Sequence, residues 1–189
     1  MRKILVIFFM SAALLAQAQK VIDDFTLTNV VDGKPVSLSA YPSCSGVIII
    51  FTSNTCPYDE YYRSRIQKLS QAYHDKVPLF LVNALVDATE SADQMSKKTQ
   101  QAGIRVPYLA DKDQVLMQKL GATKTPQAFL LKNTGGQFTV VYSGALDDNA
   151  QVESDVHHAY LRDAVDIMLA NQQIATREVR PVGCTIRKK

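Results

Sequence analysis

The stretch Val47-Ile48-Ile49-Ile50-Phe51-Thr52-Ser53-Asn54-Thr55-Cys56-Pro57-Tyr58 decides the fold of this chain. Its first five residues are apolar and mostly β-branched, which predicts a strand buried on both faces, as in parallel sheets that helices cover. A helix is expected to follow, because Pro57 suits a first helical turn and the acidic Asp59 and Glu60 favour the positive end of the helix dipole. Cys56 therefore lies at the junction of a buried strand and a helix.

Regular patterns continue on both sides of this junction. Apolar residues recur every three or four positions between Tyr58 and Tyr73, which predicts an amphipathic helix. Further strands are expected at 24–28, 36–38, 78–82, 106–109, 128–131 and 138–142, and further helices at 91–101, 115–120 and 156–169. This order predicts an α/β domain with a central mixed sheet, helices on both faces and an N-terminal β-hairpin extension.

The N-terminus is interpreted as a secretory signal peptide, residues 1–18. The basic residues Arg2 and Lys3 precede an apolar run at 4–15, and Ala16-Gln17-Ala18 is a small-x-small cleavage signature. The apolar run is short for a membrane-spanning helix; an uncleaved anchor is the alternative interpretation. We therefore expect an exported protein, periplasmic or secreted, with no membrane attachment after cleavage.

Charge and residue pairing exclude some classes of function. The 189 residues have a net charge of +3, which falls to +1 without the two basic residues of the signal peptide, so nothing favours binding to nucleic acid. No cofactor or metal site is expected, because adjacent residues such as His157 and His158 point about 100° apart on a helix and rarely share an ion. The mature chain is expected to form one domain, residues 19–176, and a basic, solvated tail, residues 177–189.

The three cysteines, Cys44, Cys56 and Cys184, allow more than one pairing. In an oxidising compartment disulfides persist, and an odd number leaves at least one cysteine without a partner in the chain. Cys44 and Cys56 flank a strand of about 20 Å, whereas a disulfide needs Cα atoms within about 7 Å. Cys184 can then bond Cys56 as a resolving cysteine, bond Cys44 as a structural staple, or bond neither.

Cys56 is the candidate reactive thiol because of its position. Active sites in α/β sheets gather at the carboxyl ends of strands. The unpaired N–H groups and the dipole at a helix N-terminus stabilise a thiolate, which is the nucleophilic form of cysteine. The alternative interpretation is that Cys56 is a small buried residue of the core.

Five segments also carry a resemblance to a known family. They are F-T-S-N-T-C-P-Y at 51–58, P-Y-L-A-D at 107–111, T-P-Q-A-F at 125–129, Y-S-G-A-L-D-D-N at 142–149 and G-C-T-I-R at 183–187. Their order and content resemble the redoxin, or AhpC/TSA-like, branch of the thioredoxin superfamily. The resemblance implies a thioredoxin-like fold and thiol chemistry, either thiol–disulfide exchange or an antioxidant, peroxiredoxin-like activity.

The resemblance also implies which residues surround the thiol. A cis-proline lies beside the active-site cysteine in thioredoxin-like domains, so Pro126 is expected to be cis and Thr125 to join the site. Lys124, next to them, is expected near Cys56, where its charge would lower the pKa of the thiol.

One departure from the family pattern changes the expected chemistry. Relatives carry C-x-x-C at this junction, whereas this chain has Ser53 in place of the first cysteine, and a hydroxyl without an adjacent base is a poor nucleophile. The preceding strand also has no carboxylate, which thioredoxins usually bury there. Ser53 matches the hydroxyl that peroxiredoxins place three residues before their cysteine, but Ile49 occupies their proline position.

Two hypotheses follow. The first is an exported thiol-based oxidoreductase of the redoxin type, with Cys56 as the sole active-site thiol and an unknown thiol or disulfide protein, or a small oxidant, as its partner. The second is a non-catalytic thioredoxin-like domain that lost its redox function with the first cysteine and serves a binding role.

Overall fold

The computed structural model describes residues 20–103 and 105–189 of the chain. The predicted signal peptide, residues 1–18, lies outside the described residues, and so does the alternative of an N-terminal anchor. Within the described ranges, every helix is too short or too polar to cross a lipid bilayer.

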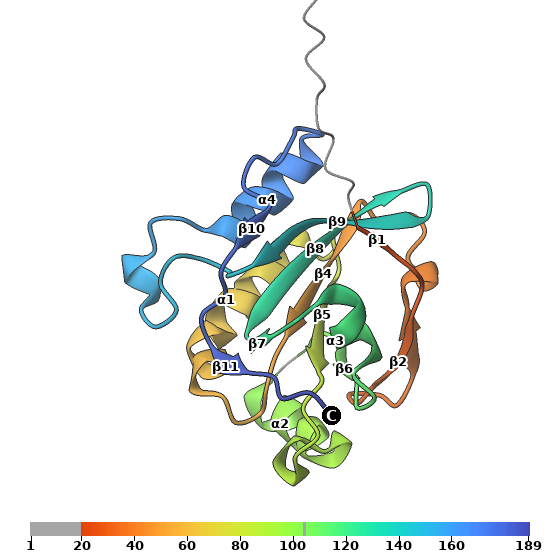
Figure 1. Ribbon diagram of the computed structural model, residues 1–189, viewed down its shortest axis with the longest axis vertical. Helices are drawn as coiled ribbons and strands as arrows, with labels where there is room; N and C mark the ends of the chain where they lie inside the picture. The colour runs from red at the N-terminus through yellow and green to blue at the C-terminus, as the bar shows by residue number, and fades with distance from the viewer. Residues whose placement is uncertain (1–19, 104) are drawn as a thin grey trace, which may run out of the picture.

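A mixed β-sheet forms the centre of the described chain (Figure 1). In spatial order its strands are β1 (Val21–Ile22), β9 (Gln137–Gly144), β8 (Gln127–Thr134), β4 (Gly46–Phe51), β5 (Leu79–Asn83), β6 (Tyr108–Ala110), β2 (Thr26–Asn29) and β3 (Pro35–Ser37). Strands β4, β5 and β6 run parallel, whereas β8 is antiparallel to β4 and β9 is antiparallel to β8. The predicted N-terminal hairpin is β2–β3, at one edge of the sheet.

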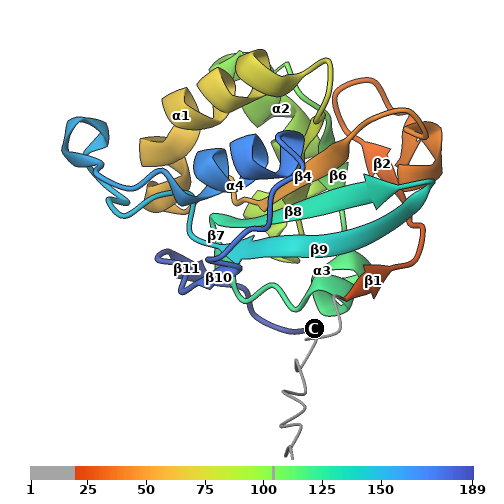
Figure 2. The same ribbon diagram turned by 90° about the horizontal axis from the view of Figure 1, so that it is seen from above.

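Helices cover both faces of this sheet, as predicted. Figure 2 shows α1 (Pro57–Tyr73), α2 (Ala92–Ala102) and α4 (Tyr160–Leu169) on one side of the sheet and α3 (Val115–Leu120) on the other. Short 3₁₀ turns occur at Leu38–Ala40, Ala88–Glu90 and Glu153–Asp155. The α/β architecture with a central mixed sheet is therefore confirmed.

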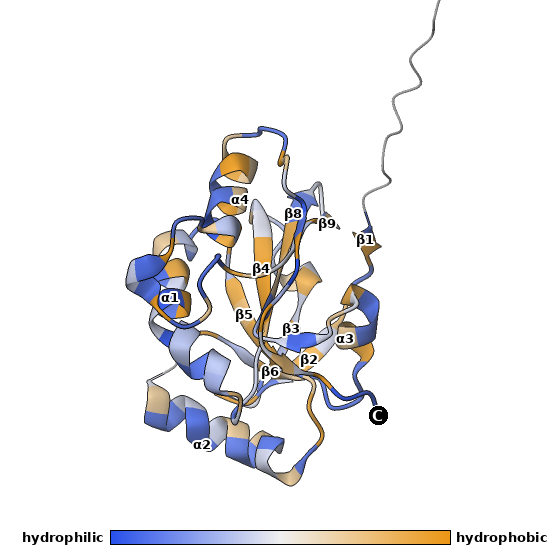
Figure 3. Ribbon diagram, turned by 60° about the vertical axis from the view of Figure 1, so that its left-hand side comes forward, coloured by the Kyte–Doolittle hydropathy of each residue, from blue (hydrophilic) through white to orange (hydrophobic). Residues whose placement is uncertain are grey.

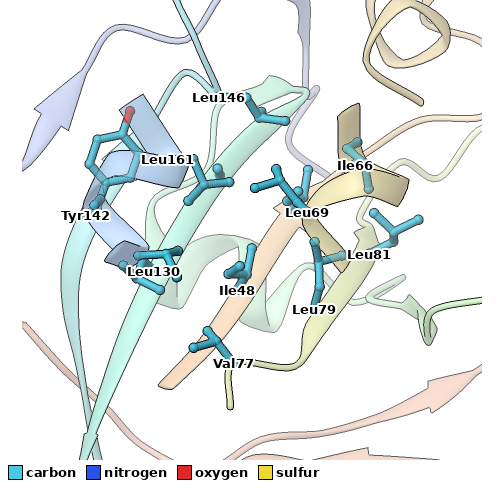
Figure 4. Close-up of a cluster of buried hydrophobic side chains, with 14 of the residues drawn as sticks. Ile48, Ile66, Leu69, Val77, Leu79, Leu81, Leu130, Tyr142, Leu146 and Leu161 are labelled. Carbon is cyan, nitrogen blue, oxygen red and sulfur yellow. The ribbon is translucent and has the colours of Figure 1, made fainter. Parts of the chain in front are cut away.

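The apolar run that predicted the buried strand supplies both halves of the core. All six residues of β4 are buried, and because strand residues alternate between faces, Ile48 packs in the cluster with Leu69 of α1 and Leu161 of α4 (Figure 4). Ile49 lies in the opposite cluster, with Leu116 of α3. Figure 3 shows hydrophobic residues concentrated on β4, β5 and β8, in contrast to the hydrophilic stretches of α1 and α2. Burying each such side chain contributes about 1.5–3 kcal/mol.

The last helix begins later than predicted. Helix α4 starts at Tyr160 rather than at residue 156. The His157 amide donates to the Asp148 carboxylate, and the His158 carbonyl accepts a hydrogen bond from the Asp148 amide, so this backbone pairs with a loop and not with a helix. The two histidines therefore do not lie on a helix.

The C-terminal tail keeps the basic side chains of Arg180, Arg187, Lys188 and Lys189 exposed, but its backbone pairs with the domain, which the sequence analysis did not predict. Strand β10 (Glu178–Val179) pairs with β9, and β11 (Cys184–Thr185) pairs with β7 (Lys124–Thr125). Ile186 is only 5% exposed and belongs to the same cluster as Leu116. The basic composition of the tail gave no indication that its backbone pairs with the domain or that Ile186 packs in the core.

Candidate active site at the Cys56–Cys184 disulfide

Cys56 lies where the sequence placed it, between β4 and α1. It is the N-cap residue of α1 and is 6% exposed. Its Sγ is bonded to Sγ of Cys184, with a Cα–Cα distance of 6.0 Å. The sequence left three alternatives for Cys184: a bond to Cys56, a bond to Cys44, or no bond. The structure contains the bond to Cys56, the candidate reactive thiol.

Cys44 is the free cysteine of the described chain. It is half-buried, and its thiol donates a hydrogen bond to the Tyr41 carbonyl oxygen at 3.1 Å. Burial raises the pKa of this thiol, against hydrogen bonds that lower it. The proposed structural staple between Cys44 and Cys184 is therefore not formed.

The segment before β8 provides the second side of the site. The Thr125–Pro126 peptide bond is cis, as the resemblance implied. The Cys56 sulfur lies 3.3 Å from the Thr125 carbonyl oxygen, and Cys184 is the pairing partner of Thr125 across β7 and β11. The Lys124 ammonium donates a hydrogen bond to the Thr185 hydroxyl at 2.8 Å. Among the described residues it makes no hydrogen bond to the Cys56 sulfur, near which it was expected.

Ser53 organises the loop that leads into α1. Its hydroxyl accepts hydrogen bonds from the amides of Thr55, at 3.0 Å, and Cys56, at 3.1 Å. It donates in turn to the Glu90 carboxylate at 2.7 Å. All of these bonds hold the loop in place, so the serine at the first-cysteine position is a structural residue of the site.

The partner of Ser53, Glu90, is a site residue that the sequence analysis missed. Glu90 is 1% exposed and accepts hydrogen bonds from the amides of Asn54 and Thr55, the Thr55 hydroxyl and the Asn83 side chain, at 2.7–3.2 Å. Burial alone would raise the pKa of Glu90, but these hydrogen bonds together with that from Ser53 hold it below its usual value. A buried carboxylate thus anchors the loop before Cys56 to the end of β5.

Replacing Glu90 with glutamine should lower the free energy of unfolding by about 1–3 kcal/mol at pH 7, because one amide group would face buried donors that need an acceptor. Urea denaturation measures this change. A carboxylate with a depressed pKa stabilises the fold above pH 4.5, its pKa when unfolded, and this contribution is lost as pH falls through the lower folded value. The matched control is Glu60→Gln, at a half-exposed side chain, where a change within about 0.5 kcal/mol is expected. Equal losses in the two variants would contradict the anchoring role.

Asp59 is the second site residue that the sequence analysis missed. It was interpreted as a helix-dipole residue, yet it is 9% exposed, and Thr52 donates to its Oδ1 at 2.6 Å. Its Oδ2 has no hydrogen-bond partner among the described residues. Burial raises the pKa of Asp59 to about 7, although the bond from Thr52 opposes this shift. The first turn of α1 therefore supplies the buried carboxylate that β4 lacks.

Asp59 and Cys56 line the same small cavity. Its volume is about 30 Å³, and Cys56, Asp59, Ser53 and Tyr108 are among the residues that line it. This space is sufficient for one water molecule. The cavity therefore brings together Cys56 and a carboxyl group whose pKa burial raises to about 7.

The D-D-N motif forms a structural ion pair away from the disulfide. Asp147 accepts hydrogen bonds from Arg65 at 2.6 Å and from the Tyr62 hydroxyl at 2.8 Å, which ties the loop after β9 to α1. Both members of the Arg65–Asp147 pair are buried. In the ranges 20–103 and 105–189, no three His, Cys, Asp or Glu residues are grouped so as to hold a metal ion.

Comparison with solved structures gives two close matches in fold, each with a TM-score of 0.80. One is a hypothetical protein from Sinorhizobium meliloti 1021, 26% identical, with 90% of this chain and 94% of that chain covered. The other is an uncharacterized conserved protein from Geobacillus kaustophilus, 27% identical, with 90% and 92% covered. The exposed lipoprotein thioredoxin Etrx1 of Streptococcus pneumoniae TIGR4 is 20% identical, with a TM-score of 0.56 and 76% and 99% covered, which shows that the fold is thioredoxin-like.

Comparison with curated proteins gives no match. The Redoxin family model, in contrast, matches residues 17–160, which is most of the chain. The matched range includes Cys56, Glu90 and Pro126 and ends before Cys184. Fold, cis-proline and cysteine position agree with this match, and the chain belongs to the Redoxin family.

Proposed function

We propose that this protein is an exported thiol–disulfide oxidoreductase that uses Cys56 and Cys184 as its redox pair. Membership of the Redoxin family supports a thioredoxin-like redox role. The observation that carries the proposal is the bond between Cys56 and Cys184 beside the cis-Pro126 peptide. Export rests on the signal-peptide pattern of residues 1–18.

In the proposed reaction the tail replaces the missing first cysteine of C-x-x-C. The Cys56 thiolate of the reduced protein attacks one sulfur of a substrate disulfide, forms a mixed disulfide and expels the other substrate sulfur as a thiolate. The Cys184 thiolate then attacks Cys56 Sγ, forms the internal bond and releases the second substrate thiolate. Two electrons pass from the cysteine pair to the substrate. The proposed acceptor for the proton of the Cys56 thiol is Asp59, because both residues line the same cavity.

The reduced protein and an aromatic disulfide that releases a coloured thiolate provide the test. With one equivalent of this disulfide, the wild type should release two thiolates per molecule and end with the Cys56–Cys184 bond and no adduct, as seen by mass spectrometry. The Cys56→Ser variant should form no internal bond with Cys184 and should keep an adduct on the tail. The matched control is Cys44→Ser, which should behave as the wild type because Cys44 lies outside the pair. A folded, reduced protein whose Cys56 stays unmodified would instead support the purely binding role.

A further inference from the structure

The tail is bound to the domain through its backbone. Strand β11 is antiparallel to β7, with Cys184 opposite Thr125 and Thr185 opposite Lys124 (Figure 1). The Ile186 amide extends this pairing by donating to the Thr123 carbonyl oxygen at 2.9 Å. Among the described strands β7 pairs with β11 only. When the tail leaves, an unpaired strand edge therefore remains beside Cys56, ready to pair with another extended segment.

The residue before the tail cysteine meets a steric limit. A Cβ added to Gly183 would lie 2.1 Å from the carbonyl oxygen of Thr125 and 3.1 Å from the nitrogen of Pro126. Both atoms belong to the backbone of the cis-proline segment, so they cannot move aside as a flexible side chain would. A segment that brings its cysteine to Cys56 in this way therefore needs glycine at the preceding position.

The residue two positions after the cysteine meets an apolar surface. Ile186 is 5% exposed and lies in the same cluster as Leu116, Leu120 and Ala122, on the side of the sheet that α3 covers (Figure 2). A charged side chain at this position would be buried without a partner. An aliphatic residue is therefore required two positions after the cysteine.

A buried glutamine binds the backbone further along the tail. Gln114 is fully buried, and its amide nitrogen donates to the carbonyl oxygens of Ala84 and Arg187, at 2.9 and 2.8 Å. Its amide oxygen accepts the Lys189 amide at 2.8 Å. Without the tail this oxygen would lose that partner. Because both bonds to the tail go to backbone atoms, Gln114 can bind another extended chain whatever its side chains at these positions.

We propose that this surface is the substrate docking site, that its substrate is an extended protein segment with the pattern Gly-Cys-x-aliphatic, and that the tail competes with the substrate for it. The proposal rests on the proposed function. Cys184 shows a route by which the cysteine of an extended segment reaches the buried Cys56, and a substrate cysteine is expected to take the same route. After the mixed disulfide forms, the Cys184 thiolate attacks Cys56 Sγ from the side opposite the substrate sulfur, and the substrate leaves as a thiolate. The tail then pairs with the vacated β7. The reduced state, in which the tail is free to leave, is therefore the state that accepts the substrate as a disulfide.

The test uses the Cys44→Ser/Cys184→Ser double variant, in which Cys56 is the one thiol. The probes are the peptide Val-Gly-Cys-Thr-Ile-Arg and two matched peptides, one with alanine for glycine and one with aspartate for isoleucine. The cysteine of each carries an aromatic thiol in disulfide linkage. Attack by Cys56 on the peptide sulfur forms the mixed disulfide and releases the coloured aromatic thiolate. The first peptide should react about 10-fold faster than either matched peptide, because each change adds a clash or an unpaired buried charge.

Competition by the tail is tested by adding Gly183→Ala to the double variant, which weakens tail docking and leaves the surface intact. The rate with the first peptide should rise severalfold; an unchanged rate would overturn the competition. Equal and rapid reaction of the three peptides would overturn the docking site and leave the proposed function standing. Failure of folded protein to react with any of them would overturn the proposed function. The reduced wild type gives a second reading, since it should reduce the peptides in the same order and end with the Cys56–Cys184 bond.

Discussion

The Cys184→Ser variant should stop at a mixed disulfide on Cys56 that the wild type resolves. In the wild type the tail thiol is tethered and docks beside the bond, so it attacks at an effective concentration on the order of millimolar. In the variant only external thiols can attack Cys56 Sγ. With an external thiol at about 10 µM, the adduct should therefore persist about 100-fold longer in the variant. Its lifetime is measured by quenching samples with acid at successive times and following the mass of the adduct by mass spectrometry of the intact protein.

The control for this experiment must separate resolution from stability. The Cys56–Cys184 bond joins residues 128 positions apart, and in the chain-entropy model a loop of this length stabilises a fold by about 4–5 kcal/mol. The Cys184→Ser variant lacks that contribution, and so does the reduced wild type, which is therefore the matched reference. If both are folded and both lose the adduct at the same rate, Cys184 is not the resolving cysteine and the proposed cycle is wrong.

The fold could be predicted from the sequence because its signals are local. The run from Val47 to Phe51 has no polar residue, and such a run is buried on both faces wherever it forms a strand. The stripe from Tyr62 to Leu69 repeats at helical spacing, and it packs on that strand as expected. The beginning of α4 was less predictable, because Asp148 pairs with the backbone of residues 157 and 158 and prevents an earlier start.

The site was only partly predictable, because its remaining contacts join distant segments. Asp59 does lie on the apolar stripe, three residues before Tyr62, and a carboxylate on such a stripe indicates burial. This signal is easily missed, because acidic residues are common near the start of a helix for another reason, the helix dipole. Glu90 follows the second buried strand, but nothing local indicates that its carboxylate binds a loop 35 residues earlier. The choice between Cys44 and Cys56 as partner of Cys184 depends on how Gly183 and Ile186 pack, which spacing does not reveal.

The Asp59→Asn variant should show a smaller rise in exchange rate across neutral pH than the wild type. Above pH 7 the buried carboxylate is ionised and can accept the proton of the Cys56 thiol; below pH 7 it holds its own proton. General base catalysis of this kind contributes about 10²–10⁴-fold, and since the thiol also ionises without help, a loss of about 10-fold or more at pH 8 is expected. The pH profile of adduct formation on Cys56 measures the effect, with Asp163→Asn as the control, at an exposed acidic residue in the first turn of α4.

The stability of the Asp59→Asn variant should change in the opposite direction to its activity. Burial raises the pKa of Asp59 from 3.8 to about 7, so the contribution of this group is greatest below pH 3.8 and is lost as pH rises through 7, where the buried carboxylate must ionise. A shift of about three pKa units corresponds to roughly 4 kcal/mol at most, so the variant should unfold at higher urea concentration than the wild type at pH 8 and not at pH 4. A gain in stability at pH 8 together with an unchanged rate profile would show that Asp59 is a buried charge without a role in proton transfer. A slower reaction and a higher stability of the variant at pH 8, found together, would identify Asp59 as the carboxylate that accepts the proton of the Cys56 thiol.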